Sequence, residues 1–336
     1  MSMARVLGVA RLWLSVALGL GSFAAGSAGA APVVLHGAGS TLSADYVEAS
    51  RPGFLAASGT AVRYDAVGSG EGIRRVATGD VDFALTDVPL TEFELKQLKL
   101  AQIPLYYCGI VVVINLPGVR DGELRLSGAA IGGLFLGEIT RWRDPRIVET
   151  NPTLAIPDLP VTVVHRADTS GTSLVFTSFL AGASEAWAQR IGQGSRLSWP
   201  AGTGVEGGAG MRDAVRATAG AIGYLEYGNA LREGLATAEL GTGKDDAVRA
   251  GAESFRRTLA ARPPESPSHY QLLTRAPTPG AWPMLATEYG LVRLKDRGSA
   301  KAEAVTRFLE SLAVSPTLAD FQFLPYRLHE AGVRGE

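Results

Sequence analysis

Short apolar runs alternate with stretches whose apolar residues recur at helical spacing along most of the chain after residue 31. The apolar runs predict strands at 33–39, 81–87, 110–116, 160–166 and 290–295. The amphipathic stretches predict helices at 42–58, 71–79, 92–101, 171–182 and 301–315. Alternation of this kind is typical of an α/β fold, and we expect its sheets to be largely parallel.

Breaks in this pattern suggest how the chain is divided. Its 336 residues are long for one domain. The Pro- and Gly-containing stretch 115–122 follows the most apolar predicted strand, and we interpret it as a crossing into a second domain. We place the return near 282–290. The stretch 242–271 is weakly patterned and predicts no element.

The N-terminus has the pattern of a secretory signal rather than of a folded element. Arg5 and Arg11 precede and flank the apolar run 12–26, and small residues follow at 28–30. We predict cleavage after Ala30, because cleavage after Ala31 would place Pro32 at the scissile bond. A membrane anchor is the alternative, but the run is short and rich in Gly, Ala and Ser. The mature protein is therefore expected to be exported and soluble.

Composition narrows the classes of partner. Apolar residues make up 46 % and charged residues 19 %, which predicts a packed core. The 32 Lys and Arg against 33 Asp and Glu give a net charge of −1, without the basic excess of a nucleic-acid-binding protein. Cys108 is the only cysteine, so no internal disulfide forms, and we interpret it as a small buried hydrophobe.

Three segments share one plan of strand, small-residue turn and helix: 36–43, 67–75 and 166–174. Their glycines let a ligand approach the backbone, and the free N–H groups at each helix start favour an anion. Ordinary N-capping explains any one of them. Three in one chain, one of them with Arg166, predict a shared anion pocket.

Asp87 ends the predicted strand 81–87 and stands just before Pro89. It is either a turn cap or a ligand contact. A carboxylate that faces an anion repels it unless the anion brings a proton. Phosphate carries such a proton at neutral pH and sulfate does not, so Asp87 would select a protonated oxyanion. Arsenate would satisfy Asp87 equally well.

The segments 37–42, 67–72, 81–91, 166–181 and 199–231 together resemble the periplasmic phosphate-binding proteins of ABC-type phosphate transporters, the PstS family. The resemblance covers most of the mature chain and is weakest from about 240 to 278. It implies an α/β fold of the periplasmic-binding-protein type II kind, with two lobes, a hinge and a central cleft. We expect 31–115 plus 286–336 to form lobe I and 116–285 to form lobe II.

The resemblance also implies a function and a set of phosphate-binding residues: Thr41, Leu42, Ser69, Asp87, Arg166, Ser170, Gly171 and Thr172. Leu42, where the family usually has Phe, would act through its backbone N–H. Asp87 would accept the phosphate proton, and Asp168 would hold Arg166 in place. The implied protein is a periplasmic monomer without cofactor or metal. It would bind phosphate with high affinity and deliver it to a membrane permease and its ATPase.

Two features depart from this pattern or add to it. The family usually has small residues after Ser69, whereas Glu71 stands here in the first turn of a predicted helix. It is either a solvent-facing residue that suits the helix dipole or one that weakens phosphate binding. The GxGxxG pattern at 202–207 is a weak dinucleotide signal, and we interpret it as a loop that touches the cleft.

A secreted phosphate-ester hydrolase is the alternative from another functional class. Ser170 or Thr172 would be the nucleophile and would need a base, for which His36 and His165 are the nearest in sequence. Successive strand residues point to opposite faces, so His165 should face away from a pocket that Arg166 enters. We therefore predict a binding protein and not an enzyme.

Overall fold

The computed structural model describes residues 33–326, apart from 244–245, 263–265 and 277. The predicted signal peptide and its cleavage site after Ala30 lie outside the described residues. Among the helices of the described part, none has the length and apolarity that crossing a membrane requires.

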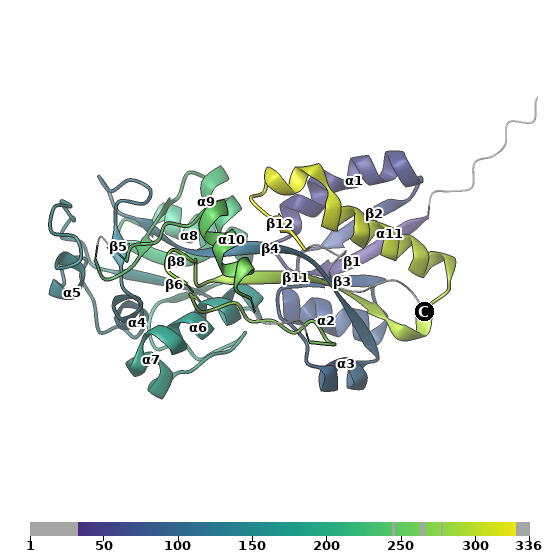
Figure 1. Cartoon of the computed structure of the whole chain (residues 1–336), viewed down its shortest axis with the longest axis horizontal. Helices are drawn as coiled ribbons and strands as arrows, with labels where there is room; N and C mark the ends of the chain where they lie inside the picture. The colour runs from purple at the N-terminus through teal and green to yellow at the C-terminus, as the bar shows by residue number, and fades with distance from the viewer. Residues whose placement is uncertain (1–32, 244–245, 263–265, 277, 327–336) are drawn as a thin grey trace, which may run out of the picture. The chain divides into compact units, whose positions relative to one another are not determined.

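A single run of paired strands organises the fold (Figure 1). Its order is β2 (Ala61–Asp65), β1 (Val34–Gly39), β3 (Phe83–Thr86), β11 (Leu285–Arg293), β4 (Leu100–Asn115), β8 (Ala221–Glu226), β6 (Thr162–Arg166) and β7 (Thr203–Val205). The short strands β9 (Ala236–Thr237) and β12 (Leu324–Pro325) also pair with β4, whereas β5 (Arg125–Leu126) and β10 (Glu239–Leu240) form a separate pair.

Strand β4 joins two parts of this sheet. Its residues 100–109 pair with β11, and its residues 110–115 pair with β8. We call β2, β1, β3, β11 and residues 100–109 the first sheet segment, and residues 110–115, β8, β6 and β7 the second. Residues 104–114 of β4 are all buried, as expected for an apolar strand covered on both faces.

The prediction of largely parallel sheets is wrong. β1 runs parallel to β2 and β3, and β6 runs parallel to β7 and β8. However, β4 runs antiparallel to both β11 and β8, and β11 runs antiparallel to β3. A continuous apolar run shows that a strand is buried but carries no information on its direction. The fold is therefore α/β with a mixed sheet.

Helices gather around both sheet segments (Figure 1). Those beside the first are α1 (Ala44–Ser58), α2 (Ser69–Thr78), α3 (Glu92–Leu98) and α11 (Ala300–Val314). Those beside the second are α4 (Gly128–Phe135), α6 (Gly171–Ala183), α7 (Glu185–Arg190), α8 (Gly207–Ala217) and α9 (Tyr227–Arg232). The remaining helices are α5 (Pro145–Val148), α10 (Ala252–Ala260), and the 3-10 turns Leu294–Asp296 and Pro316–Ala319.

Two further differences from the predicted elements concern boundaries. Strand β4 begins at Leu100, so the helix predicted for 92–101 ends at Leu98. Helix α10 lies in the stretch that predicted no element. Its buried aromatic residue is Phe255, whose ring lies edge-to-face against that of Tyr227.

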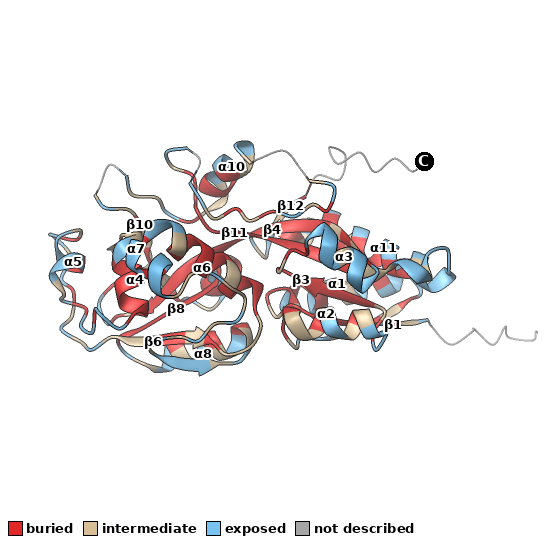
Figure 2. Ribbon diagram, turned by 90° about the horizontal axis from the view of Figure 1, so that it is seen from below, coloured by how far each residue is buried: buried red, intermediate tan, exposed pale blue. Residues whose placement is uncertain are grey.

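The strands form the core, and the outward faces of the helices are exposed (Figure 2). Cys108 in β4 is 2 % exposed, and burial raises the pKa of its thiol well above the ordinary value. Its interpretation as a small buried hydrophobe is confirmed. The limits of the two lobes, 31–115 plus 286–336 and 116–285, stay a prediction.

Candidate functional site

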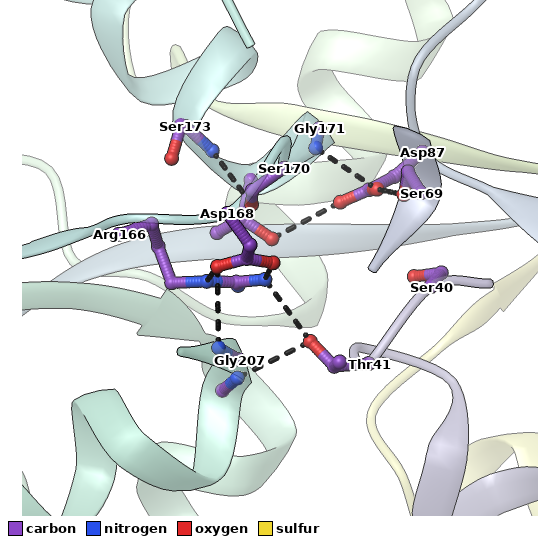
Figure 3. Close-up of polar contacts among 12 residues, drawn as sticks. Ser40, Thr41, Ser69, Asp87, Arg166, Asp168, Ser170, Gly171, Ser173 and Gly207 are labelled. Atoms are coloured by element: carbon purple, nitrogen blue, oxygen red, sulfur yellow. Dashed lines mark hydrogen bonds and ion pairs between the residues drawn. The ribbon is translucent and has the colours of Figure 1, made fainter. Parts of the chain in front are cut away.

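Four strand-to-helix connections carry the site: β1 to α1, β2 to α2, β6 to α6 and β7 to α8. In each, a helix begins where its N–H groups are still free of intrahelical partners. Side chains from the ends of these connections contact one another (Figure 3). The sequence predicted the first three connections. The fourth was predicted only as a loop at 202–207, but it forms β7 and the start of α8.

Asp87, directly after β3, joins the two sheet segments (Figure 3). Its Oδ1 accepts hydrogen bonds from Ser69 Oγ at 2.5 Å and from the Gly171 N–H at 3.1 Å. Its Oδ2 accepts one from Thr172 Oγ1 at 3.0 Å. The carboxylate is 3 % exposed. A buried carboxylate thus lies among hydroxyl and N–H donors at the N-termini of α2 and α6.

Arg166, at the end of β6, is the buried cation of the site. Its Nε donates to Asp168 Oδ1 at 2.6 Å, and its Nη2 contacts Asp168 Oδ2. Burial by itself would lower the pKa of the guanidinium, but the hydrogen bond and charge of Asp168 outweigh it and raise that pKa. Burial likewise opposes ionisation of Asp168, but Arg166 lowers the pKa of this carboxyl below its ordinary value. Both groups are therefore held charged.

Thr41 provides a second connection between the sheet segments. Its Oγ1 accepts hydrogen bonds from Arg166 Nη2 at 3.3 Å and from the Gly208 N–H at 3.2 Å. The neighbouring Gly207 N–H donates to Asp168 Oδ1 at 3.2 Å. A hollow of about 400 Å³ beside these contacts is lined by Thr41, Asp168 and Gly207 among others.

The start of α6 is built for close approach. Ser170 is its N-cap, and the Ser170 Oγ accepts a hydrogen bond from the Ser173 N–H at 3.2 Å. Gly171 follows, and a Cβ there would lie 2.3 Å from Asp87 Cγ. Only glycine therefore lets the helix start reach the Asp87 carboxylate.

Comparison with known proteins places the chain in a family. Residues 26–313 match the family model described as a PBP superfamily domain. The phosphate-binding protein PstS of Xylella fastidiosa is 33 % identical over 83 % of this chain and 77 % of its own. That of Haemophilus influenzae is 36 % identical over 70 % of this chain and 71 % of its own. This protein belongs to the PstS family.

The fold agrees with this assignment. The crystal structure of a phosphate-binding protein from Stenotrophomonas maltophilia matches with a TM-score of 0.63 and 19 % identity. The match covers 88 % of this chain and 91 % of that one. The expectation of a periplasmic-binding-protein fold, drawn from the sequence motifs, is confirmed by the family model and by this likeness.

The structure brings together most of the residues that the PstS resemblance selected. The hydrogen bonds given above connect these residues in two groups. One is Asp87 with Ser69, Gly171 and Thr172. The other is Arg166 with Asp168 and Thr41. Leu42 lies in the turn before α1, and its side chain is 5 % exposed within the hydrophobic core. Only its backbone is thus suited to a ligand. The roles of these residues toward phosphate stay a prediction.

Sequence reasoning missed Tyr224 and the two glycines at the start of α8. The Tyr224 hydroxyl accepts a hydrogen bond from the backbone N–H of Arg166 at 3.0 Å. It also forms a hydrogen bond with Ser173 Oγ at 2.8 Å. An aromatic residue inside a buried strand looks like any other core residue, so no local signal reveals it. Gly207 could have been found, because the glycine-rich loop was predicted to touch the cleft.

Glu71 lies in the first turn of α2 and pairs with two arginines of the same helix. Its oxygens accept from Arg74 Nε and Nη2, both at 2.8 Å, and from Arg75 Nε at 2.8 Å. The Arg74 and Arg75 hydrogen bonds lower the pKa of this carboxyl to about 2. Its charge is thus compensated locally, which favours the interpretation as a solvent-facing residue. Its effect on a ligand stays a prediction.

One of the two candidate bases of a hydrolase, His165, packs against an aromatic ring. The His165 ring stacks on Trp199, with centroids 4.9 Å apart and planes at 12°, while Arg166 contacts Asp168. The two side chains therefore have different surroundings, as strand alternation predicts. Across the described residues, no group of three His, Cys, Asp or Glu side chains could hold a metal ion.

Proposed function

We propose that this protein binds inorganic phosphate at the site formed by Thr41, Ser69, Asp87, Arg166 and residues 170–172. The observation that supports this most is the environment of Asp87, a buried acceptor among hydroxyl and N–H donors. A protonated oxyanion can donate to the carboxylate and accept from its neighbours. A fully ionised oxyanion can only accept.

The binding sequence we propose begins at the first sheet segment. Phosphate contacts Thr41, Ser69 and Asp87, and closure of the second lobe then adds Arg166 and the start of α6. Because Asp87 already accepts from Ser69, Gly171 and Thr172, these donors must be shared with phosphate or turned toward it. Bending in β4, the long strand that runs through both segments, would supply the hinge.

The free energies expected of the hydrogen bonds are large enough for high-affinity binding. Hydrogen bonds to charged groups contribute about 1.5–3 kcal/mol each. Several of them exceed the roughly 8 kcal/mol of a micromolar complex. The excess offsets the removal of water from phosphate and the ordering of the lobes.

The biological role we propose follows the PstS relatives. The protein acts in the periplasm as a monomeric solute-binding protein, with its signal peptide cleaved after Ala30. It delivers phosphate to the permease and ATPase of an ABC transporter. It is a binding protein without catalytic activity or cofactor, and its lobes are 31–115 plus 286–336 and 116–285.

Calorimetric titration of the ligand-stripped mature protein with phosphate, and separately with sulfate, tests this function. We expect one-to-one phosphate binding at or below micromolar concentration and no heat from sulfate. Absence of phosphate binding would refute the proposal and direct attention to Glu71 and to other protonated oxyanions, arsenate first. Turnover of a chromogenic phosphate ester would instead support the hydrolase alternative.

A further inference from the structure

A second buried carboxyl group lies near Asp87, because Tyr289 of β11 pairs with Thr86, the residue directly before Asp87. Glu288 is on β11, opposite Tyr106 of β4, and is 1 % exposed. The pairing of β11 with β4 shifts register between Glu288 and Tyr289. Such bulges redirect side chains and are common next to functional sites. The irregularity therefore coincides with the one buried acid on this strand.

Glu288 lacks the partners that a buried carboxylate needs. Neither of its oxygens has a hydrogen-bond partner of normal geometry among the described residues. The Ser43 and Ser40 hydroxyls lie near its carboxyl group. Ser43 Oγ accepts from Tyr106 OH at 2.7 Å, and Ser40 Oγ is itself buried without a partner in the described part of the chain. Ser40 directly precedes Thr41 of the site.

Within the described part of the chain, the titratable groups that act on Glu288 include no cation. Asp87 approaches from the end of β3, Tyr64 from β2, and Tyr106 and Cys108 from β4. Helices α2 and α6 also pack against β11, but no charged side chain of theirs acts on Glu288. Burial first, and then the charge of Asp87, raise the pKa of Glu288 well above its ordinary value.

The charge of the site also favours a neutral, protonated Glu288. Arg166 compensates only one of the two carboxylates, Asp87 and Asp168, that contact the candidate ligand residues. A bound phosphate would add further negative charge. An ionised Glu288 in the same buried region would repel it, because a charge in a medium of low permittivity is poorly screened.

We propose that Glu288 is a positioning and specificity residue that must be protonated when phosphate is bound, and that phosphate binding draws this proton from solvent whenever Glu288 is ionised. The inference rests on the proposed function. The neutral acid removes repulsion behind Asp87 and leaves Asp87 as the acceptor of the phosphate proton. Affinity should therefore fall on the alkaline side, as Glu288 loses its proton in the free protein.

The test is the number of protons taken up on binding. The mature wild-type protein is titrated with inorganic phosphate in steps from about pH 6 to the highest pH at which it stays folded, in pairs of buffers with different ionisation enthalpies. Glu288→Gln mimics the neutral acid. Glu226→Gln is the matched control, because Glu226 is also a buried acid beside β4 but is not shifted by Asp87.

We expect Glu288→Gln to bind phosphate within about threefold of wild type at the acid end and at least threefold more tightly at the alkaline end. It should take up fewer protons than wild type, whereas Glu226→Gln should match wild type. Equal proton uptake by wild type and Glu288→Gln would overturn the inference while leaving phosphate binding intact. The inference would also be overturned if Glu226→Gln took up fewer protons than wild type while Glu288→Gln took up as many as wild type.

A second measurement does not depend on phosphate binding or on the Gln variant. Infrared spectroscopy of the wild-type protein should show the carbonyl stretch of a buried protonated carboxylic acid, shifted in Glu288→Asp. Phosphate added at alkaline pH should increase this band. A wild-type protein without phosphate heats would refute the proposed function, and a missing band at neutral pH would refute the role of Glu288.

Discussion

At the residue scale, Asp87 combines two tasks that are usually separate. Its carboxylate connects α2 and α6 through Ser69, Gly171 and Thr172. In the proposed function it is also the acceptor that a protonated ligand needs. Since an amide has the same shape but one acceptor oxygen fewer, substitution by asparagine tests the second task without removing the side chain.

Asp87→Asn should weaken rejection of sulfate relative to phosphate by at least tenfold, because the amide no longer repels a fully ionised oxyanion. Competition between sulfate and phosphate for the purified variant measures this ratio. If selectivity stays at the wild-type value, Asp87 serves only as a cap between the helices.

Arg166 is expected to dominate affinity, since it is the buried cation of the site. Arg166→Ala should weaken phosphate binding by at least tenfold, as measured by calorimetry. Arg141→Ala is the matched control, because Arg141 also pairs with an aspartate, Asp158, but in an exposed position. Wild-type affinity in Arg166→Ala would remove this residue from the site.

At the element scale, the site depends on how closely helix starts approach the strand ends. Helix α6 reaches Asp87 because residue 171 has no side chain. Strand β8, which pairs with β4, ends in the buried Glu226. Substitutions at Gly171 in α6 and at Glu226 in β8 therefore test these two features.

Gly171→Ala should weaken phosphate binding by at least tenfold, because the new Cβ would push α6 away from Asp87. Gly182→Ala in the same helix meets no atom within 4 Å and should leave affinity unchanged. It should also stabilise the helix by up to about 1 kcal/mol. Equal affinities of the two variants would mean that α6 does not need this approach.

Glu226 should make stability depend on pH. Burial raises its pKa from the ordinary 4.5 to about 7, so the folded protein keeps a proton that the unfolded chain loses. The contribution of Glu226 to the free energy of unfolding should thus fall by about 3 kcal/mol as pH rises from about 4.5 to 7, and then level off. In urea titrations, Glu226→Gln should lack this contribution. A variant with the wild-type pH profile would contradict it.

At the scale of the whole molecule, the contacts of Asp87 and Thr41 are made between the two sheet segments. These are hydrogen bonds of individual groups, whereas β4 runs continuously through both segments. A ligand that strengthens the first set can therefore shift an equilibrium between open and closed lobes without disturbing the strands.

Spin labels at Lys96→Cys on α3 and Glu185→Cys on α7 should report this shift. Both side chains are exposed, and the native Cys108 is buried and should not be labelled. Phosphate should narrow the distribution of label distances, and sulfate should leave it unchanged. A distribution of label distances that phosphate, like sulfate, leaves unchanged would mean that the lobes do not close on phosphate.

The sequence by itself determined much of this protein. Apolar periodicity predicted β1, β3, β6, parts of β4 and β11, and the helices α1, α2, α3, α6 and α11. Ser, Thr and Gly at helix starts marked three of the four site connections. These signals are local, because capping and backbone conformation depend on neighbouring residues. The motifs around Asp87 and Arg166 also indicated the family before any geometry was known.

Only the tertiary structure decided the rest. Strand direction in β4 and β11 follows from pairing partners far apart in the chain, and Tyr224 becomes part of the site only because β8 lies beside β6. Glu288 is an ordinary acid in the sequence. Its burial on β11, opposite the irregular part of β4 and near Asp87, depends on several segments packing together, and no local pattern encodes such an environment.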